Sequence, residues 1–243
     1  MVPNCISLEE LRASRTDILP WIIEKNEDSA ESAGELRERF LQSCAAYCVI
    51  SYLLGIGDRN LHNLLLRPDG SLFHIDFGFV LGQDPKPLEK PQMRITPEML
   101  AALGGSESMA YKRFRELSSR IYNCVRRHMN EFVVMLRMLV DSIPMIEENG
   151  HISEEKLMYE IRRRFAPGES YKEAEILLYN HIDQSTTRTF TYQLIDKCHT
   201  WATSSSLSSA TGLRGAYKTA NVLLQTLWTV SGFEKPEETV GKE

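Results

Sequence analysis

Apolar residues recur at helical spacing over residues 34–54, and this is the clearest pattern in the chain. Four of them show the repeat of three to four residues: Leu36, Phe40, Cys44 and Cys48. The charged residues lie in the first turns, and the later half is apolar on all sides. Such a segment is typical of a helix buried in a core. It runs into Gly55 and Gly57, so we expect a buried helix followed by a glycine-rich loop.

A β-hairpin is predicted a few residues further on. Two short apolar runs, residues 64–66 and 72–75, flank the tripeptide Pro68-Asp69-Gly70. Proline sets φ at the second turn position and glycine accepts a positive φ, so a tight turn centred near Asp69 is expected. Partner residues across the hairpin should then have numbers that sum to about 139, within one register step.

Three oxygen-bearing side chains flank this hairpin. Asn63 and Asp76 sum to 139, so they should meet at its open end, and Asp58 lies shortly before them. Phosphoryl transfer needs a carboxylate that orients the attacking hydroxyl, together with an Asp and an Asn that hold Mg²⁺. Magnesium keeps water and phosphate oxygens and takes few protein ligands, so one Asp and one Asn suffice. The pattern therefore predicts a phosphoryl-transfer site.

The remaining pattern is mostly helical. Residues 1–33 have apolar positions for one or two short helices, and four prolines after Asp76 make residues 76–96 a long loop. Thr96 followed by Pro97 is typical of a helix N-terminus. Further helices are expected over residues 97–103, 107–141, 153–165, 170–183 and 187–202. The fold class is α+β, mostly α.

The end of the chain changes character. Residues 204–212 are rich in Ser, Thr, Ala and Gly and are expected to form a flexible linker. A single helix over residues 216–230 and a disordered charged end are expected beyond it.

Composition narrows the function classes. The 243 residues are 42% apolar and 25% charged, and the net charge of −5 offers no general attraction to nucleic acid. Five cysteines without C-x-x-C spacing indicate buried thiols in a reducing compartment. No signal peptide or membrane-spanning run is present, so a cytosolic or peripheral protein is expected.

Several other polar residues have simpler interpretations. His74 precedes Ile75 and Asp76 in the second hairpin strand and is expected to be packed rather than to act as a base. The Arg126-Arg127 and Arg162–Arg164 clusters are expected to lie on solvated helix faces.

The run GIGDRNLHN followed by LFHIDFG resembles the catalytic lobe of phosphatidylinositol 3-kinases, and GQDPKPL after it is most similar to the class III enzymes. The resemblance covers about residues 1–203. It implies the C-terminal lobe of a kinase-like fold, with the small hairpin at the catalytic cleft. Residues 1–33 would be a segment that precedes the lobe, residues 34–203 the lobe itself, and residues 204–243 a tail. The lobe would contain a catalytic loop (55–63), an activation loop (76–96) and C-terminal helices (97–203).

The resemblance also implies roles. It implies transfer of the ATP γ-phosphate to the 3-hydroxyl of phosphatidylinositol at a membrane surface, with Mg²⁺ or Mn²⁺ as cofactor. Asp58 would be the catalytic-loop carboxylate beside Arg59 and Asn60, and Asn63 and Asp76 the metal ligands. Leu65 and Ile75 would line the floor under the adenine.

The resemblance extends to the acceptor and to partners. The activation loop carries only three scattered basic residues: Lys86, Lys90 and Arg94. Each extra phosphate on a headgroup needs charge-assisted donors, so sparse basicity favours unphosphorylated phosphatidylinositol. A regulatory kinase-like subunit and a coiled-coil adaptor are the implied partners, with peripheral location on endosomal and autophagic membranes.

Two departures from the family pattern leave alternatives open. Asn60 stands where the family has a histidine, and an amide cannot exchange a proton near neutral pH. Nothing before residue 34 resembles a glycine-rich phosphate loop or a strand with an ATP lysine, so the chain alone is expected to be inactive. A non-catalytic scaffold is therefore the alternative function. A related protein serine/threonine kinase is a weaker one.

Overall fold

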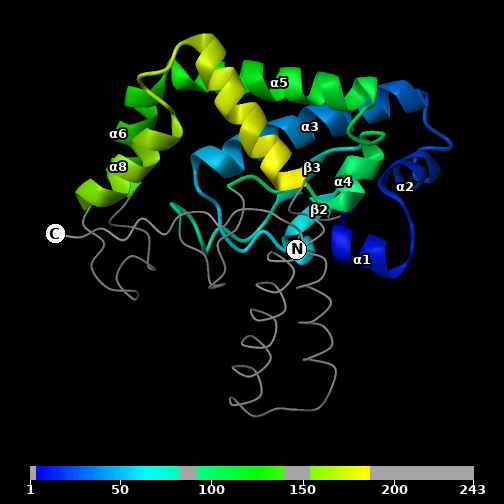
Figure 1. Ribbon diagram of the computed structural model, residues 1–243. Coiled ribbons are helices and arrows are strands. Elements are labelled where there is room, and N and C mark those ends of the chain that lie inside the picture. Colours follow the sequence, from blue (N-terminus) through cyan, green and yellow to red (C-terminus); the bar gives the residue numbers. More distant parts are fainter. Residues whose placement is uncertain (1–3, 83–91, 140–153, 187–243) are drawn as a thin grey trace, which may run out of the picture. The chain divides into compact units, whose positions relative to one another are not determined.

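The computed structural model describes residues 4–82, 92–139 and 154–186 (Figure 1). The chain divides into two compact units, Met1–Thr187 and Arg188–Glu243, and all the described residues belong to the first. The helix predicted over 187–202, the tail, and most of the proline-rich loop lie outside the described residues. Figure 1 shows a mostly helical unit with one small sheet, which confirms the predicted fold class.

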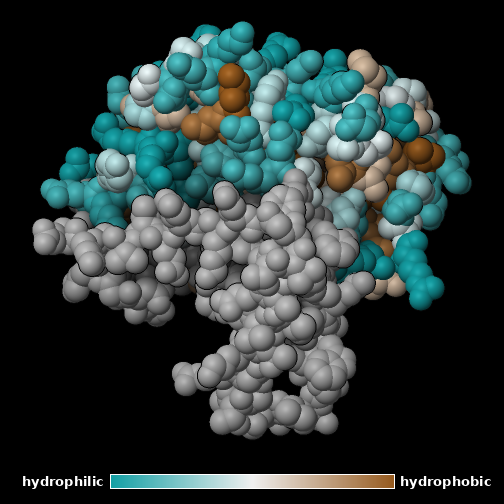
Figure 2. All heavy atoms as spheres, viewed as in Figure 1, coloured by the Kyte–Doolittle hydropathy of each residue, from teal (hydrophilic) through white to brown (hydrophobic). Residues whose placement is uncertain are grey.

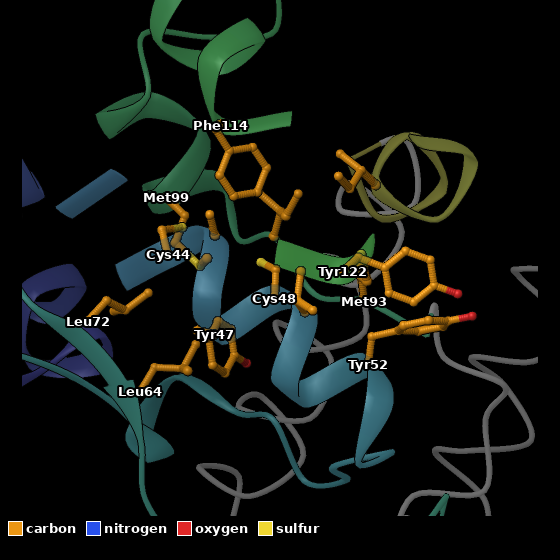
Figure 3. Packing of buried hydrophobic residues seen from close by; sticks show 14 of the residues in the cluster. Cys44, Tyr47, Cys48, Tyr52, Leu64, Leu72, Met93, Met99, Phe114 and Tyr122 are labelled. Carbon is orange, nitrogen blue, oxygen red and sulfur yellow. The ribbon is translucent and has the colours of Figure 1, made fainter. Parts of the chain in front are cut away.

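Helix α3 (Ala33–Leu53) is the centre of the core. Ser32 caps it and forms a reciprocal capping box with Glu35, which satisfies two backbone N–H groups at its N-terminus. One side of α3 packs on α5 (Met109–Arg126) and the other on the sheet. Figure 3 shows side chains of α3 between those of α5 and the hairpin; the labelled core residues include Cys44, Cys48, Leu64 and Phe114, all fully buried. The predicted buried helix is confirmed.

The sheet has three antiparallel strands in the order β1 (Ile6–Ser7), β2 (Leu64–Leu66) and β3 (Leu72–His74). The predicted hairpin is β2–β3, and its register pairs Leu64 with His74, so partner numbers sum to 138. This lies within the one-step tolerance of the prediction. The strand β1 was not predicted, because two residues that pair with a strand sixty positions away carry no local pattern.

The hairpin turn has its predicted centre at Asp69. Gly70 has φ +91° and donates its N–H to the carbonyl of Arg67 at 3.0 Å. Asp69 Oδ1 accepts a hydrogen bond from the N–H of Ser71 at 2.9 Å. Arg67 N–H also donates to the carbonyl of Ser71 at 3.0 Å, which leaves three loop residues, 68–70. A turn with glycine in the left-handed position is a common way to close such a loop.

Shorter helices surround this core. They are α1 (Leu8–Ala13), α2 (Ile18–Glu24), α4 (Pro97–Ala102), α8 (Glu154–Arg164) and a helix over residues 171–186. Thr96 caps α4 as predicted, and Ser170 and Glu173 form the predicted capping contacts of the last described helix. None of the described helices is both long and apolar enough to cross a bilayer. The face seen in Figure 2 is mostly hydrophilic, with apolar residues in small separate groups.

The single long helix predicted over residues 107–141 is wrong. Two helices, α5 and α6 (Met129–Leu139), occupy its described part, with a break at Arg127 and His128. The N–H groups of these two residues bond to carbonyls three positions back, which tightens the end of α5. No Pro or Gly marks the break, so the periodicity alone did not reveal it.

The expectation that both arginine clusters are solvated is also wrong for two of their members. Arg126 donates to the carbonyls of Phe165, Ala166 and Glu169 at 2.6–2.7 Å. Arg164 Nη1 donates to the carbonyl of Tyr52 at 2.8 Å. Their partners are backbone oxygens from distant parts of the chain, which residue type does not reveal.

Candidate active site

The loop after α3 holds the first candidate carboxylate in an unusual backbone conformation. Asp58 has φ +42°, which a non-glycine residue adopts at a cost of about 1–3 kcal/mol. Such strain persists where surrounding contacts enforce it, and here hydrogen bonds from two asparagine side chains do so. Asn63 Nδ2 donates to the Asp58 carbonyl at 3.0 Å and to its carboxylate at 3.4 Å, and Asn60 Nδ2 donates to the carboxylate at 3.2 Å.

Asn60 has a second, structural task in this loop. Its Oδ1 accepts hydrogen bonds from the N–H groups of His62 and Asn63 at 3.0 and 3.2 Å. It thereby caps the short 3₁₀ helix η1 (Leu61–Asn63). Both ends of the amide are therefore occupied, one with the helix cap and one with Asp58.

The second carboxylate, Asp76, follows β3 and also has a positive φ, +67°. Its Oδ1 accepts a hydrogen bond from the N–H of Gly78 at 3.1 Å. The N–H of Ile75 donates to the carbonyl of Asn63 at 2.9 Å, so the hairpin pairing continues one step beyond the strands. Asn63 is thus opposite Ile75, and Asp76 is one residue further along. Asn63 and Asp76 thus both lie at the open end of the hairpin, one register step from the predicted pairing, and their meeting as metal ligands stays a prediction.

The oxygens left at this mouth suit a hard divalent cation. The Asn63 amide nitrogen donates to Asp58, so its Oδ1 is left out of that contact. Asp76 keeps its second carboxylate oxygen, Oδ2, out of the turn bond. Within the described chain, no group of three or more His, Cys, Asp or Glu is placed to bind a metal. An Asn–Asp pair fits Mg²⁺, which completes its shell with water and phosphate.

One face of the hairpin presents apolar side chains. Leu64, Leu66 and Leu72 are buried in the core, whereas Leu65 and Phe73, which pair with each other, are half-buried. Side chains alternate between the two faces of a sheet, so Asn63, Leu65, Phe73 and Ile75 share this open face. The predicted pair Leu65 and Ile75 is therefore joined by Phe73. The period of two in the strand sequence was the signal that could have found it.

The chain after Asp76 returns to the start of the same loop. Gly57 N–H donates to the carbonyl of Phe79 at 2.8 Å. The N–H groups of Leu81 and Gly82 donate to the carbonyls of Leu54 and Gly55 at 2.7 and 2.9 Å. These three bonds join the segment that carries Asp58 to the segment that carries Asp76.

The basic residues singled out in the sequence have different positions. Arg59 is buried, and its Nη1 donates to the carbonyl of Gln92 at 2.8 Å, which anchors the chain beyond the proline-rich loop. Arg94 is half-buried. Burial raises the pKa of the nearby Tyr47 phenol, and the charges of Arg59 and Arg94 act in the opposite direction. Lys86 and Lys90 lie outside the described residues.

His74 is packed, as expected from the sequence. Its ring stacks on Tyr47 with 6.1 Å between centroids and meets the edge of Phe77 at 5.5 Å. Burial, and then the charge of Arg59, lower the pKa of His74, and Asp76 and Asp58 act in the opposite direction. Neither ring nitrogen has a hydrogen-bond partner among the described residues.

Comparison with known proteins shows which family this sequence is similar to. Residues 6–146 match the family described as phosphatidylinositol 3- and 4-kinase. The chain is 40% identical over 166 residues to the root isoform of phosphatidylinositol 3-kinase of Glycine max, which covers 68% of this chain and 20% of the relative.

Two further relatives give the same picture. Phosphatidylinositol 3-kinase VPS34 of Saccharomyces cerevisiae is 41% identical over 156 residues, covering 63% of this chain and 17% of the relative. The VPS34 protein of Arabidopsis thaliana is 38% identical over 166 residues, covering 68% and 20%. The chain thus spans about a fifth of the length of these relatives. Because the family match covers more than half of the chain, the chain belongs to the phosphatidylinositol 3- and 4-kinase family.

Proposed function

We propose that this chain carries the catalytic loop and the metal-binding part of a class III-like phosphatidylinositol 3-kinase site. The reaction is transfer of the ATP γ-phosphate to the 3-hydroxyl of phosphatidylinositol. The observation that carries the proposal is the loop geometry. Asp58 is clamped by Asn60 and Asn63, while Asn63 and Asp76 keep oxygens at the hairpin mouth.

The residues divide the work by chemistry. Asp58 accepts a hydrogen bond from the attacking inositol hydroxyl and orients it, because its strained backbone and its amide partners fix the carboxylate. Asn63 Oδ1 and an oxygen of Asp76 would hold Mg²⁺ or Mn²⁺. The metal, when bound, offsets the charge that develops on the transferring phosphoryl group.

The open hairpin face fits the nucleotide base. Leu65, Phe73 and Ile75 form an apolar strip beside Asn63, so a flat adenine could lie on the strip while its phosphates reach the metal ligands. An aromatic and two branched aliphatic side chains suit such a contact.

The acceptor side rests on charge. Arg94, with Lys86 and Lys90 of the activation loop, would receive the single phosphate of phosphatidylinositol. An acceptor in a bilayer requires an enzyme that binds the membrane surface, and we propose endosomal and autophagic membranes. The proposed partners are a regulatory kinase-like subunit and a coiled-coil adaptor. Vesicle flotation and co-purification from cells would test these two parts.

A chimera tests the catalytic proposal directly. The matched segment of the Saccharomyces cerevisiae relative is replaced by the corresponding residues of this chain. We expect MgATP-dependent formation of the 3-phosphate on vesicles that contain phosphatidylinositol, and its loss with Asp76→Asn. A folded, vesicle-bound chimera that transfers phosphate only to protein substrates would favour the protein kinase alternative.

A non-catalytic scaffold is the second candidate, and the observation that favours it is Asn60. Its amide oxygen caps η1 and its amide nitrogen donates to Asp58. An amide cannot act as a general acid or base near neutral pH. A chimera that shows no lipid kinase activity with Asn60 but is active with Asn60→His would assign the natural sequence to the non-catalytic scaffolds. Silence in both forms would overturn the lipid kinase proposal as well.

A further inference from the structure

Arg164 lies against the junction of the two segments that carry the metal-type ligands. It comes from α8, more than a hundred residues after the loop, and its Nη1 donates to the carbonyl of Tyr52 at 2.8 Å. Tyr52 is in the last turn of α3, directly before the glycine loop. The carbonyl end of a helix carries partial negative charge, so a guanidinium there is favourable.

The same guanidinium also contacts the two glycines where the segments meet. A Cβ on Gly55 would lie 3.1 Å from Arg164 Cζ and Nη2, and 2.5 Å from the nitrogen of Gly82. A Cβ on Gly82 would lie 3.4 Å from Arg164 Nη2. Both glycines have positive φ, +56° and +87°. Glycine at position 55 thus allows the two backbones to approach at a distance that a Cβ would prevent, and the arginine packs beside both glycines.

These contacts flank the bonds that tie the two segments together. Gly82 N–H donates to Gly55 carbonyl at 2.9 Å, and Leu81 N–H to Leu54 carbonyl at 2.7 Å. Asp58 follows Gly55 by three residues, and Asp76 precedes Gly82 by six. A shift at the junction would therefore be passed to both carboxylates.

The backbone and the side chain of Arg164 are both held by contacts with tyrosines. The Tyr122 hydroxyl donates to the Arg164 carbonyl at 2.7 Å, and the Tyr52 ring lies 5.9 Å from the guanidinium. The next residues after α8 are held by Arg126. The side chain thus projects from a fixed backbone and is not a mobile surface arginine.

We infer that Arg164 is a positioning residue that couples helix α8 to the Asp58 loop and the Asp76 segment, and so sets the spacing of the metal ligands. The inference rests on the proposed function for the metal, but the contact itself can be tested without catalysis.

The experiment uses the full chain and four forms: wild type, Arg164→Met, Arg164→Lys and Arg163→Met. Arg163 is the matched control, because it is the preceding residue of α8, is exposed, and pairs its guanidinium with Glu160 of the same helix. Hydrogen–deuterium exchange is followed at the amides of Gly57, Leu81 and Gly82, and Mn²⁺ binding is followed by electron paramagnetic resonance. Circular dichroism checks that each form is folded.

We expect Arg164→Met to speed exchange at these amides by about tenfold or more while the amides of the α3 core keep wild-type rates. Mn²⁺ binding should weaken in parallel, Arg164→Lys should recover part of both losses, and Arg163→Met should match wild type. A uniform rise over the whole chain, or no change at the junction, would overturn the inference. Faster exchange with unchanged Mn²⁺ affinity would also overturn it, because Arg164 would then be structural only.

Failure of the proposed function has a different signature. A wild-type chain that binds no Mn²⁺ would count against the metal site, and exchange at the junction alone would then decide whether Arg164 couples the two segments.

Discussion

At the residue scale, the site depends on side chains whose two ends have separate tasks. The Asn63 side-chain nitrogen donates to Asp58, so its oxygen is left for a ligand at the hairpin mouth. Asn60 works in the same way, with its oxygen on the η1 cap and its nitrogen on Asp58. Within the described residues the Asp58 carboxylate is thus oriented by neutral amides rather than by a cation.

Asn60→His should therefore raise the rate and lower the stability. The new imidazole can exchange protons, and restored acid–base help would raise phosphoryl transfer by the chimera on the order of 10²–10⁴-fold. It cannot accept the two N–H bonds in the same way, and loss of a cap costs about 1 kcal/mol of unfolding free energy. Lipid kinase assays and urea unfolding measure the two effects. His62→Gln, an exposed change in the same turn, is the control and should alter neither.

At the scale of elements, local patterns predicted what is local. The capped starts of α4 and of the helix over 171–186, the hairpin and its turn all follow from neighbouring residues. The strand β1 and the roles of Arg126 and Arg164 were missed because their partners are backbone groups distant in sequence. For the site, residue types and spacing predicted that Asp58 and Asn63 lie together, which their hydrogen bonds confirm, whereas a metal site shared with Asp76 stays a prediction. They could not predict the positive φ values that hold both carboxylates.

Arg126 should contribute more to the free energy of unfolding than the next residue, Arg127. Arg126→Gln removes charge-assisted bonds to three carbonyls at the end of α8 and beyond, and we expect a loss of about 2–3 kcal/mol. Arg127→Gln changes an exposed side chain and should stay within about 0.5 kcal/mol of wild type. Urea unfolding compares the two. Equal losses would show that the carbonyl contacts contribute nothing specific.

Gly70 should tolerate no side chain. Its φ is +91°, and an added Cβ would lie 2.7 Å from the carbonyl oxygen of Leu36 in α3. Gly70→Ala should cost more than about 1 kcal/mol, because both strain and a clash with helix backbone oppose it. Gly168→Ala is the matched control, since nothing lies within 4 Å of its added Cβ. Thermal unfolding of both variants is the measurement, and similar melting temperatures would contradict the prediction.

At the scale of the whole molecule, buried histidines make stability depend on pH. Burial, followed by the charges of Arg164 and Arg163, lowers the pKa of His181, whose ring lies 4.9 Å from that of Tyr52. The unfolded chain binds a proton near the ordinary histidine value, about 6.5, before the folded chain does. The contribution of His181 to stability is therefore complete above that value and is lost as the pH falls below it.

His181→Gln should reduce this acid sensitivity. The neutral amide binds no proton, so the fall in melting temperature between pH 7.5 and pH 5 should be smaller than in wild type. His128→Gln, at an exposed position, should leave the fall unchanged. Thermal unfolding at several pH values provides the comparison, and identical pH profiles for His181→Gln and wild type would refute the assignment.

The two-residue length of β1 has a consequence for how the protein is made. Ile6 pairs with Leu66, so at synthesis rates of about 5–20 residues per second the strand waits roughly 3–12 s before its partner exists. A long unpaired edge would be a template for other chains during that wait. Two residues offer almost no such template, whereas β2 and β3 emerge together and close over a three-residue turn. The sheet can therefore accept its first-made strand last, with little risk of aggregation on the ribosome.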